Sequence, residues 1–353
     1  MEPVRWGVLG VATHFILRVL MPLLKSETVE VMGVASRNGD RARRTAEQWS
    51  IPRWYGSYEE LLRDKDIEAV FIPLPNHLHV EWIRKAADAG KHVLCEKPLA
   101  LNATEAADAV AYAEKAGVIL MEAFMYRFHP QWRRALELVR VGEIGSVRAV
   151  HTYFVYDLKD PSNIRNKPEM GGGALMDIGC YAVSVPRWLF GREPERVLGI
   201  VERDSQLKTD IFCSAILDFG NGRSLFSVGT QLFPFQRVDI HGTGGHISVH
   251  VPFNMYPDTP PGLTVITSIG KREVELPAAD QYGLEFEAFS RAVRDTESRD
   301  ARSRDARSRD AGTSSFRPWA GLPGLTPPQD AIDNQKVLDA LFRSAESGQW
   351  ERP

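Results

Sequence analysis

The stretch "VRWGVLGVATHF", residues 4–15, decides the fold of the first part of the chain. It starts as a short apolar run typical of a buried strand and passes through Gly10 into residues 16–26, where apolar residues recur at helical spacing. A tight turn between strand and helix lets backbone N–H groups approach a pyrophosphate. Ala12 and Phe15 stand where later glycines of the dinucleotide fingerprint G-x-G-x-x-G would be. A strand and helix with incidental glycines is therefore the competing interpretation of this turn.

The same alternation continues downstream. Strands are expected at 29–36, 67–75, 92–98 and 118–124, with helices between them opening near residues 40, 79 and 103. Strand and helix in turn over roughly 120 residues are typical of an α/β, doubly wound parallel sheet of the Rossmann type. We therefore predict a dinucleotide-binding domain over residues 1–125.

The rhythm changes after Phe124. A helix at 130–142 is followed by alternating strand candidates between 147 and 269, separated by turn signals such as "FGNGR" and "GTGG". This pattern predicts an α+β domain over residues 126–353, with a large, open-faced, mainly antiparallel sheet and helices on one face. Two domains also suit a chain of 353 residues.

One segment is compositionally unusual. "SRDARSRDARSRDAG", residues 298–312, repeats five residues almost unchanged. A period of five matches neither helix nor strand, so we expect a solvated, low-complexity insertion at about 297–325.

Composition excludes several classes of protein. The net charge of -3 gives no basic footprint for nucleic acid, and no apolar run is long enough to span a bilayer. Three scattered cysteines argue against a disulfide framework, and the N-terminus shows no signal peptide, so a cytoplasmic protein is expected. The spacing of His77, His79 and His129 does not suit a metal site, so no metal is predicted.

The end of the second strand indicates the cofactor. Ser36 and Arg37 stand where an NAD-selective site has an acidic residue for the ribose hydroxyl. An arginine there favours NADP(H), with NAD(H) possible. The alternative is that Arg37 and the nearby arginines 41, 43 and 44 only solvate a helix.

The stretch "HVLCEKPLALN", residues 92–102, places Lys97 just after a buried strand. The carboxyl ends of parallel strands border the crevice where ligands bind, so Lys97 is expected to lie there. Glu96 can hold the ammonium, and Pro98 fixes the turn. Asn76 and His79 follow the preceding strand and are expected at the same edge.

Four motifs together carry a family resemblance. They are "GVLGVA" (7–12), "IPLPNHLH" (72–79), "EKPLA" (96–100) and "GGGALMDIGCY" (171–181). With them the chain resembles the glucose-fructose oxidoreductase, inositol dehydrogenase and rhizopine-catabolism (Gfo/Idh/MocA) family over nearly its whole length. It is most similar to the sugar 3-ketoreductases and 3-dehydrogenases of deoxysugar and aminosugar pathways, including antibiotic biosynthesis. The resemblance implies NAD(P)-dependent oxidation or reduction at a sugar carbon.

The resemblance also assigns roles to residues. Lys97 matches the family's active-site lysine, Asp177 its aspartate, and Tyr181 stands where many members have histidine. Moving a hydride to or from a carbinol carbon requires a second group to move the proton on oxygen, and a nearby cation stabilises alkoxide character. Tyrosine would need Lys97 close by to act at neutral pH. Lys97, Tyr181 and Asp177 are therefore the predicted catalytic residues.

The remaining predicted site residues fall into two groups. The cofactor group contains Gly10, Ala12, Thr13, Ser36, Arg37, Pro73, Leu74, Asn76, His79, Glu96, Lys97 and Arg127, and the substrate group contains Arg165, Asp177, Tyr181 and Tyr282. Arg165 suits a phosphate of a nucleotide-linked substrate, or it caps a loop. For Tyr181 the competing interpretation is a core aromatic.

The leading hypothesis is an NAD(P)-dependent oxidoreductase that acts on a sugar or sugar-nucleotide, in a direction that the motifs do not give. One alternative is a glycosidase or epimerase with permanently bound NAD, and another is a non-catalytic sugar sensor that binds the dinucleotide. An open sheet face without obvious cover predicts a homodimer or homotetramer.

Overall fold

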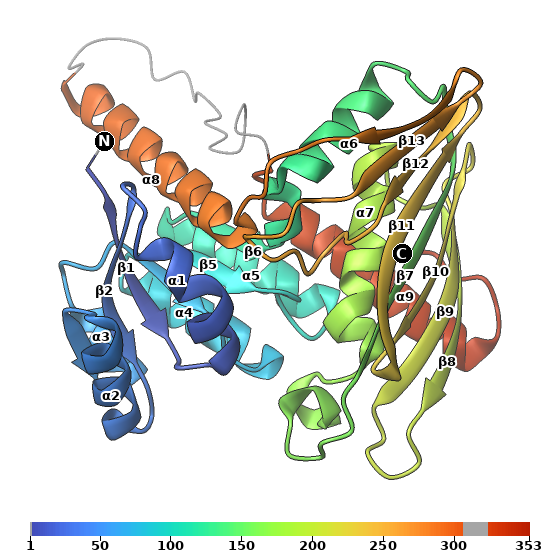
Figure 1. Ribbon diagram of the computed structural model, residues 1–353. Coiled ribbons are helices and arrows are strands. Elements are labelled where there is room, and N and C mark those ends of the chain that lie inside the picture. The colour runs from blue at the N-terminus through green and yellow to red at the C-terminus, as the bar shows by residue number, and fades with distance from the viewer. Residues whose placement is uncertain (1, 306–323) are drawn as a thin grey trace.

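The computed structural model describes residues 2–305 and 324–353 and contains two sheets (Figure 1). The first is a parallel sheet in the order β3-β2-β1-β4-β5-β6. Its strands are β1 (Val4–Leu9), β2 (Val29–Ala35), β3 (Arg53–Tyr55), β4 (Ala69–Ile72), β5 (His92–Glu96) and β6 (Leu120–Ala123). The strand order reverses direction beside β1, which is the switch point at which doubly wound sheets bind ligands. The predicted Rossmann-type sheet is confirmed.

The helices around this sheet start where the sequence provides caps. They are the π-helical η1 (Phe15–Leu20), α1 (Met21–Leu23), α2 (Gly39–Trp49), α3 (Tyr58–Arg63), the 3₁₀ turn η2 (Asn76–Leu78), α4 (His79–Asp88) and α5 (Ala103–Ala116). The side chains of Asn38, Ser57 and Asn102 each accept a hydrogen bond from a backbone N–H of the first turn of α2, α3 and α5.

The second sheet is mainly antiparallel, as predicted, in the order β14-β13-β12-β11-β7-β10-β9-β8. Its strands are β7 (Val147–Asp157), β8 (Arg196–Arg203), β9 (Asp210–Asp218), β10 (Arg223–Gly229), β11 (Gln231–Gly242), β12 (Gly245–Val249), β13 (Leu263–Thr267) and β14 (Gly270–Val274). The pair β7 and β10 is parallel.

Helices cover one face of the second sheet. They are α6 (Pro130–Arg140), α7 (Cys180–Phe190) and α9 (Gln329–Ser347), and they lie between the two sheets (Figure 1). Short turns connect the elements: η3 (Met125–Phe128), η4 (Ile164–Asn166), η5 (Pro168–Met170) and η6 (Leu175–Gly179). The inner strand residues alternate with outward ones, so this face and its helices share one buried core.

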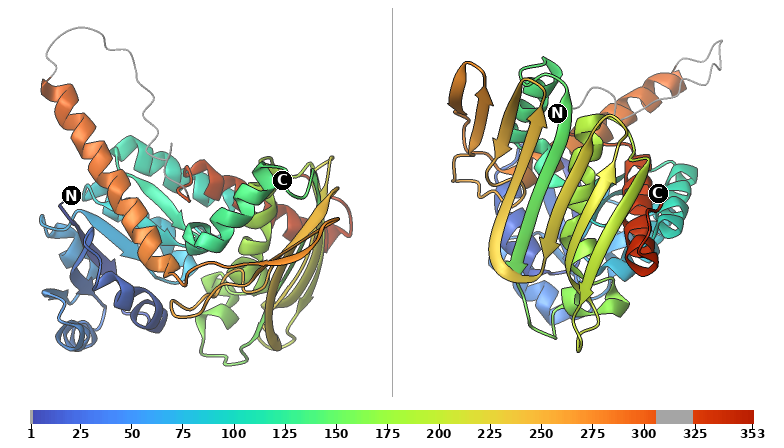
Figure 2. Two further views of the ribbon diagram at one scale, coloured as in Figure 1. Left: turned by 45° about the horizontal axis from the view of Figure 1, so that its top comes forward. Right: turned by 90° about the vertical axis from the view of Figure 1, so that its right-hand side faces the viewer.

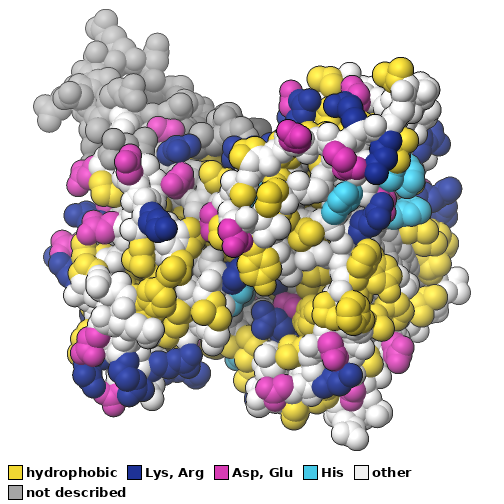
Figure 3. Space-filling view, viewed as in Figure 1, with side chains coloured by type: hydrophobic (Ala, Val, Ile, Leu, Met, Phe, Trp, Pro, Cys, Tyr) yellow, Lys and Arg dark blue, Asp and Glu magenta, His cyan; other side chains and the backbone are white. Residues whose placement is uncertain are grey.

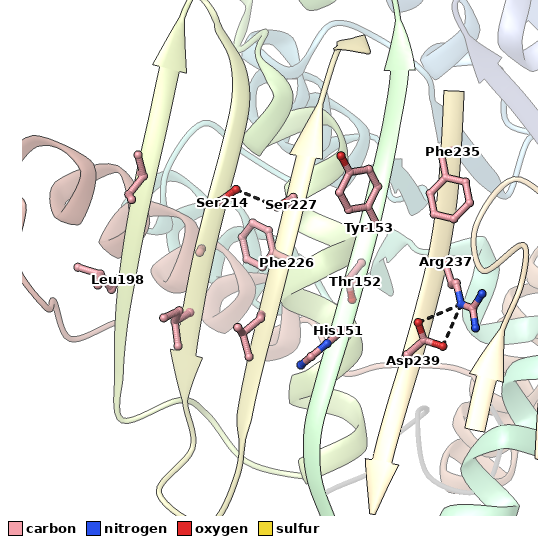
Figure 4. A pocket seen from close by; sticks show the side chains of 14 residues that line it. His151, Thr152, Tyr153, Leu198, Ser214, Phe226, Ser227, Phe235, Arg237 and Asp239 are labelled. Atoms are coloured by element: carbon pink, nitrogen blue, oxygen red, sulfur yellow. Dashed lines mark hydrogen bonds and ion pairs between the residues drawn. The ribbon is translucent and has the colours of Figure 1, made fainter. Parts of the chain in front are cut away.

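The other face of the second sheet is bare (Figure 2, right). Large apolar side chains are exposed on it, among them Ile200, with 74% of its surface exposed, and Phe235, with 51%. A shallow hollow of about 520 Å³ crosses this outer face (Figure 4). Its lining includes His151, Tyr153, Leu198, Ser214, Leu225, Phe235, Arg237 and Asp239. The prediction of an open-faced sheet is confirmed.

The long helix α8 (Gln281–Asp305) returns from the second half of the chain to the first sheet (Figure 1). The Trp6 ring of β1 lies 4.7 Å from that of Phe286 and 5.3 Å from that of Phe289, and Trp6 Nε1 donates to Ser290 Oγ at 3.1 Å. The N-terminal sheet is therefore completed by residues far along the chain.

The helix α8 also corrects one expectation. It continues through the first part of the "SRDAR" repeat to Asp305, where we expected a solvated loop. Alanine and arginine favour helix, and a helix that has already started extends at low cost. Residues 306–323, which hold most of the rest of the predicted insertion, lie outside the described residues. Among the described residues no helix is long and apolar enough to cross a membrane.

Candidate active site

A cleft of about 1010 Å³ lies at the carboxyl ends of β1, β4 and β5 and faces the second sheet. Figure 3 shows the molecule hollowed between its two halves, with lysine or arginine side chains inside the hollow. The lining from the first half includes Ala12, Thr13, His14, Arg18, Arg41, Pro73, Leu74, Asn76, Glu96 and Lys97. The lining from the second half includes Tyr156, Asp157, Arg165, Asp177, Tyr181, Tyr256 and Tyr282.

Lys97 is held in this cleft by Asp177. Its Nζ donates to the Asp177 carbonyl oxygen at 2.7 Å and to Asp177 Oδ1 at 3.0 Å. Burial by itself would lower the pKa of the ammonium, but the charge of Asp177, together with those of Cys180 and Glu96, outweighs burial and raises the pKa. The partner expected from sequence was Glu96; the structure shows Asp177 in that role, while burial raises the pKa of the Glu96 carboxyl.

Local backbone geometry places Asp177. It lies in the π-helical turn η6, and such turns occur often at functional sites. Just before it, Gly173 has a φ of +121°, and a Cβ there would clash with the Asp210 carboxylate. Asp210 in turn accepts from the Leu175 backbone N–H at 2.6 Å. The glycine therefore allows close packing that fixes the start of the Asp177 turn.

Asp177 also accepts hydrogen bonds from two further side chains. Tyr156 Oη donates to Asp177 Oδ2 at 2.5 Å, and Arg165 Nε donates to the same oxygen at 3.1 Å. Burial would raise the pKa of the Asp177 carboxyl, but Lys97, Arg165 and the Tyr156 hydroxyl hold it well below its usual range. Asp177 is therefore ionised at neutral pH and organises three side chains around the cleft.

Tyr181 lies beneath Lys97 rather than beside it. The ammonium is 5.1 Å from the centroid of the Tyr181 ring, and Tyr181 Oη contacts Met125 Sδ at 3.5 Å. The ring packs among aromatic neighbours, Phe124, Tyr126, Phe154 and Phe253. Burial raises the pKa of its hydroxyl well above the usual value. Lys97 is therefore close to Tyr181, as expected, but it lies over the ring, and Tyr181 lines the cleft.

The first turn can accommodate a dinucleotide. Gly10 has a φ of +132°, and a Cβ there would lie 3.2 Å from the side chain of Leu74, a residue that lines the cleft, as do Ala12 and Thr13 of the same turn. Phe15, at the third glycine position of the fingerprint, is fully buried 6.0 Å from the Phe71 ring. The phenylalanine that replaces the fingerprint glycine therefore packs in the core beneath the turn.

Of the arginines that follow β2, the one that lines the cleft is not the one expected. Arg41 lines the cleft, and its Nη2 donates to the Val11 carbonyl oxygen at 2.5 Å. Arg37 is exposed next to Tyr58, and Ser36 Oγ accepts from the Asn38 backbone N–H at 3.1 Å; neither lines the cleft. From the sequence, Arg41 was considered only as one of the arginines that solvate a helix.

Two other predicted cofactor residues, His79 and Arg127, do not line the cleft. His79 is fully buried, with its ring nitrogens 2.9 Å from the carbonyl oxygens of Leu74 and Pro98. It thereby joins the loops that follow β4 and β5. Arg127 is buried away from the cleft, where its guanidinium pairs with Asp330 at 2.9 Å.

Several cleft residues were not anticipated. His14 Nε2 lies 3.0 Å from Tyr282 Oη, which places the predicted substrate residue Tyr282 against the first turn. Burial, followed by the charge of Lys97, lowers the pKa of His14 to about 4, so it is neutral at pH 7. Tyr156 was missed because nothing in the sequence of β7 distinguishes it from the other alternating residues.

In the described ranges no group of three or more histidine, cysteine or acidic side chains could hold a metal ion.

Comparisons with known proteins extend these observations. A family model described as "Oxidoreductase family, NAD-binding Rossmann fold" matches residues 4–124, and a "GFO/IDH/MocA C-terminal domain" model matches residues 132–248. The chain is 40% identical to an uncharacterized oxidoreductase of Rhizobium meliloti over 99% of each chain. It is 38% identical to a D-xylose 1-dehydrogenase (NADP(+)) of Haloferax volcanii, over 97% of this chain and 98% of the relative.

One similar solved structure contains ligands. A 3-ketoreductase from Actinomadura kijaniata, in complex with NADP and TDP-benzene, superposes with a TM-score of 0.84 at 28% identity. The similarity covers 97% of this chain and 98% of the reductase.

Proposed function

The chain belongs to the Gfo/Idh/MocA oxidoreductase family, and from this we propose that it transfers a hydride between nicotinamide C4 and a carbinol or ketone carbon of a sugar or sugar derivative, with a preference for NADP(H). The observation that carries the proposal is the buried Lys97–Asp177 pair at the end of β5, inside the cleft that both halves line. A 3-ketoreductase relative binds NADP, and another relative is a NADP(+)-dependent xylose dehydrogenase.

The cleft residues of the first half are suited to binding NADP(H). We propose that Gly10, Ala12, Thr13, Pro73, Leu74, Asn76 and Glu96 hold the dinucleotide, with Arg41, Ser36 and Arg37 at the 2'-phosphate. When bound, NADP(H) would supply or accept the hydride. Arginine is favoured at the 2'-phosphate because its planar fork matches phosphate oxygens.

Lys97 is proposed to move the proton on the substrate oxygen. Two of its three N–H groups donate to Asp177, which leaves one for the substrate. In the reductive direction that group donates a proton to the oxygen that becomes an alkoxide, and the ammonium charge stabilises the developing anion. Asp177 keeps Lys97 oriented. We also propose that Tyr181, whose ring centroid lies 5.1 Å from the ammonium, moves this proton together with Lys97.

The outer face of the second sheet is proposed to join copies of the chain in a homodimer or homotetramer. Four exposed apolar side chains lie on strands β8, β10, β7 and β11 of this face: Ile200, Leu225, Tyr153 and Phe235. An apolar area of this kind is unusual on a monomer and is typical of an interface. We also propose that residues 1–125 act as the cofactor unit and residues 126–353 as the substrate and assembly unit.

The first test is a fluorescence titration of the purified protein with NADPH and with NADH. It is followed by absorbance at the reduced-nicotinamide band against D-xylose, D-glucose and keto-sugars. Tighter binding of NADPH and its consumption or production with a sugar would support the proposal. Binding of both cofactors without turnover would contradict it and favour an enzyme with permanently bound cofactor, or a sensor.

A further inference from the structure

Tyr156 is a half-buried side chain of β7 for which the proposed reaction has no assigned use. Its hydroxyl lies in the cleft and donates to Asp177 Oδ2 at 2.5 Å, while Lys97 donates to Asp177 Oδ1 at 3.0 Å. One carboxylate therefore fixes both side chains, one on each of its oxygens.

The hydrogen bond to Asp177 determines what Tyr156 can offer a substrate. A phenol carries one proton, and here that proton is directed at an ionised carboxylate, which is a strong, charge-assisted acceptor. The Tyr156 oxygen retains only lone pairs for the cleft, so it can accept a hydrogen bond but not donate one. Lys97 is the opposite, because an ammonium can only donate.

This donor and acceptor pair has a counterpart in sugar chemistry. The reacting oxygen of a ketone or carbinol must accept from Lys97, whereas a hydroxyl on the neighbouring carbon can donate to Tyr156. The two protein groups bind the two oxygens of a single carboxylate, and both line the same cleft, so a vicinal diol, whose oxygens stand on adjacent carbons, can contact both. A methylene on the neighbouring carbon would leave the Tyr156 oxygen without that partner.

We infer that Tyr156 selects substrates that carry a hydroxyl beside the reacting carbon, so that the enzyme interconverts a vicinal diol and its α-hydroxy ketone and discriminates against deoxy analogues. The inference rests on the proposed function. In the reductive direction the ketone carbon gains a hydride from NADPH, the ketone oxygen gains a proton from Lys97, which solvent replaces, and NADP⁺ is released. The neighbouring hydroxyl is unchanged, so Tyr156 is a positioning residue.

Two features set the size of the effect. A site built to bind a hydroxyl rejects the analogue that lacks it, because the protein group is left without its partner. Tyr156 is only half-buried, and water can partly replace the missing hydroxyl. We therefore expect a preference of about tenfold rather than the far larger factors of fully enclosed sites.

The test compares D-glucose with its 2-, 3- and 4-deoxy analogues in the presence of NADP⁺, with product analysis to identify the oxidised carbon. For the wild type, kcat/KM should be about tenfold higher for D-glucose than for the analogue that lacks the hydroxyl next to that carbon. In Tyr156→Phe this ratio should fall to about 1 to 3. The matched control is Tyr112→Phe, which removes another tyrosine hydroxyl that donates to an aspartate, Asp88, outside the cleft.

An unchanged ratio in Tyr156→Phe would overturn the inference. This includes an equal loss of kcat/KM for D-glucose and the deoxy sugar, which is the result expected if Tyr156 only supports Asp177. Calorimetric binding of the same sugars to the NADPH-loaded protein separates this outcome from a failure of the proposed function. Without turnover, tighter binding of D-glucose that Tyr156→Phe abolishes would still support hydroxyl selection, and equal binding of D-glucose and all three deoxy sugars would refute it.

Discussion

Among single residues, Lys97 carries the largest share of the proposed chemistry. Replacing it with alanine removes the only ammonium that lies against Asp177 among the described residues. We expect kcat to fall by about 10² to 10⁴, the usual contribution of a positioned acid or base, while the Kd for NADPH changes little. Steady-state kinetics and fluorescence titration measure the two quantities. Lys85→Ala, at an exposed lysine of α4, serves as the control, and unchanged turnover in Lys97→Ala would refute the assignment.

Arg41 and Arg37 can be distinguished by the same titration. If Arg41 binds the 2'-phosphate, Arg41→Ala should weaken NADPH binding by about 10- to 100-fold, the value of a charge-assisted hydrogen bond, and NADH binding much less. Arg37→Ala should have the smaller effect, because Arg37 lies next to Tyr58 outside the cleft. Equal weakening of NADPH and NADH in Arg41→Ala would show that Arg41 only supports the Val11 turn.

The site also shows where residue patterns stop being informative. The position of Lys97 followed from the end of a parallel strand, and its resemblance motif agreed with it. Arg41 could not be chosen over Arg37, because the choice depends on where the Asn38 cap starts α2. Tyr156 carries no motif, and its partner Asp177 is 21 residues away in the sequence. Contacts of that kind depend on tertiary packing.

At the scale of elements, β6 provides a pH-dependent contribution to stability. Glu122 is fully buried near the end of this strand, where its Oε1 accepts from the Leu99 backbone N–H at 2.8 Å. Burial, together with the charge of Asp330, raises the pKa of this carboxyl to about 7. Because folding raises the pKa of this carboxyl, its contribution to stability is fully present at pH values below the pKa of the unfolded state, about 4.5. The contribution is lost as the pH rises through the pKa of the folded state, about 7.

Glu122→Gln should therefore remove part of the pH dependence of unfolding. The folded wild type should lose up to about 3 kcal/mol between pH 4.5 and 7 relative to the variant, since each pKa unit corresponds to 1.36 kcal/mol. Urea unfolding of both proteins across this pH range measures the difference. Parallel stability curves would show that Glu122 is already ionised in the folded protein.

Whole elements were predictable where their pattern is periodic and long. The strands β1, β2, β4 and β5 and the helices between them appear where the alternation placed them. The strands β3 and β14 lack the buried apolar run that marks β4 and β5, because their residues are exposed or half-buried, and α3 has only six residues, less than two helical turns. The π-helical turns η1 and η6 depend on how buried side chains fit, which a local pattern does not contain.

At the scale of the whole molecule, the bare sheet face predicts assembly. Phe235→Glu places a charge at the centre of this face, beside the Tyr153 ring, and should shift a dimer or tetramer to the monomer. Sedimentation velocity measures the change. Val141→Glu, at an exposed apolar residue at the end of α6, should leave the assembly intact. A wild-type protein that sediments as a monomer at micromolar concentration would contradict the proposal.

The contact of α8 with Trp6 has a consequence for synthesis. A ribosome that has made the six strands of the first sheet has not yet made Phe286, Phe289 or Ser290, which cover one face of β1. The nascent sheet must therefore keep an apolar surface exposed while more than 150 further residues emerge, from Ala123 to Gln281. We therefore expect the N-terminal half to become native only after α8 has been made, and chaperones that shield apolar surfaces to bind the chain before then.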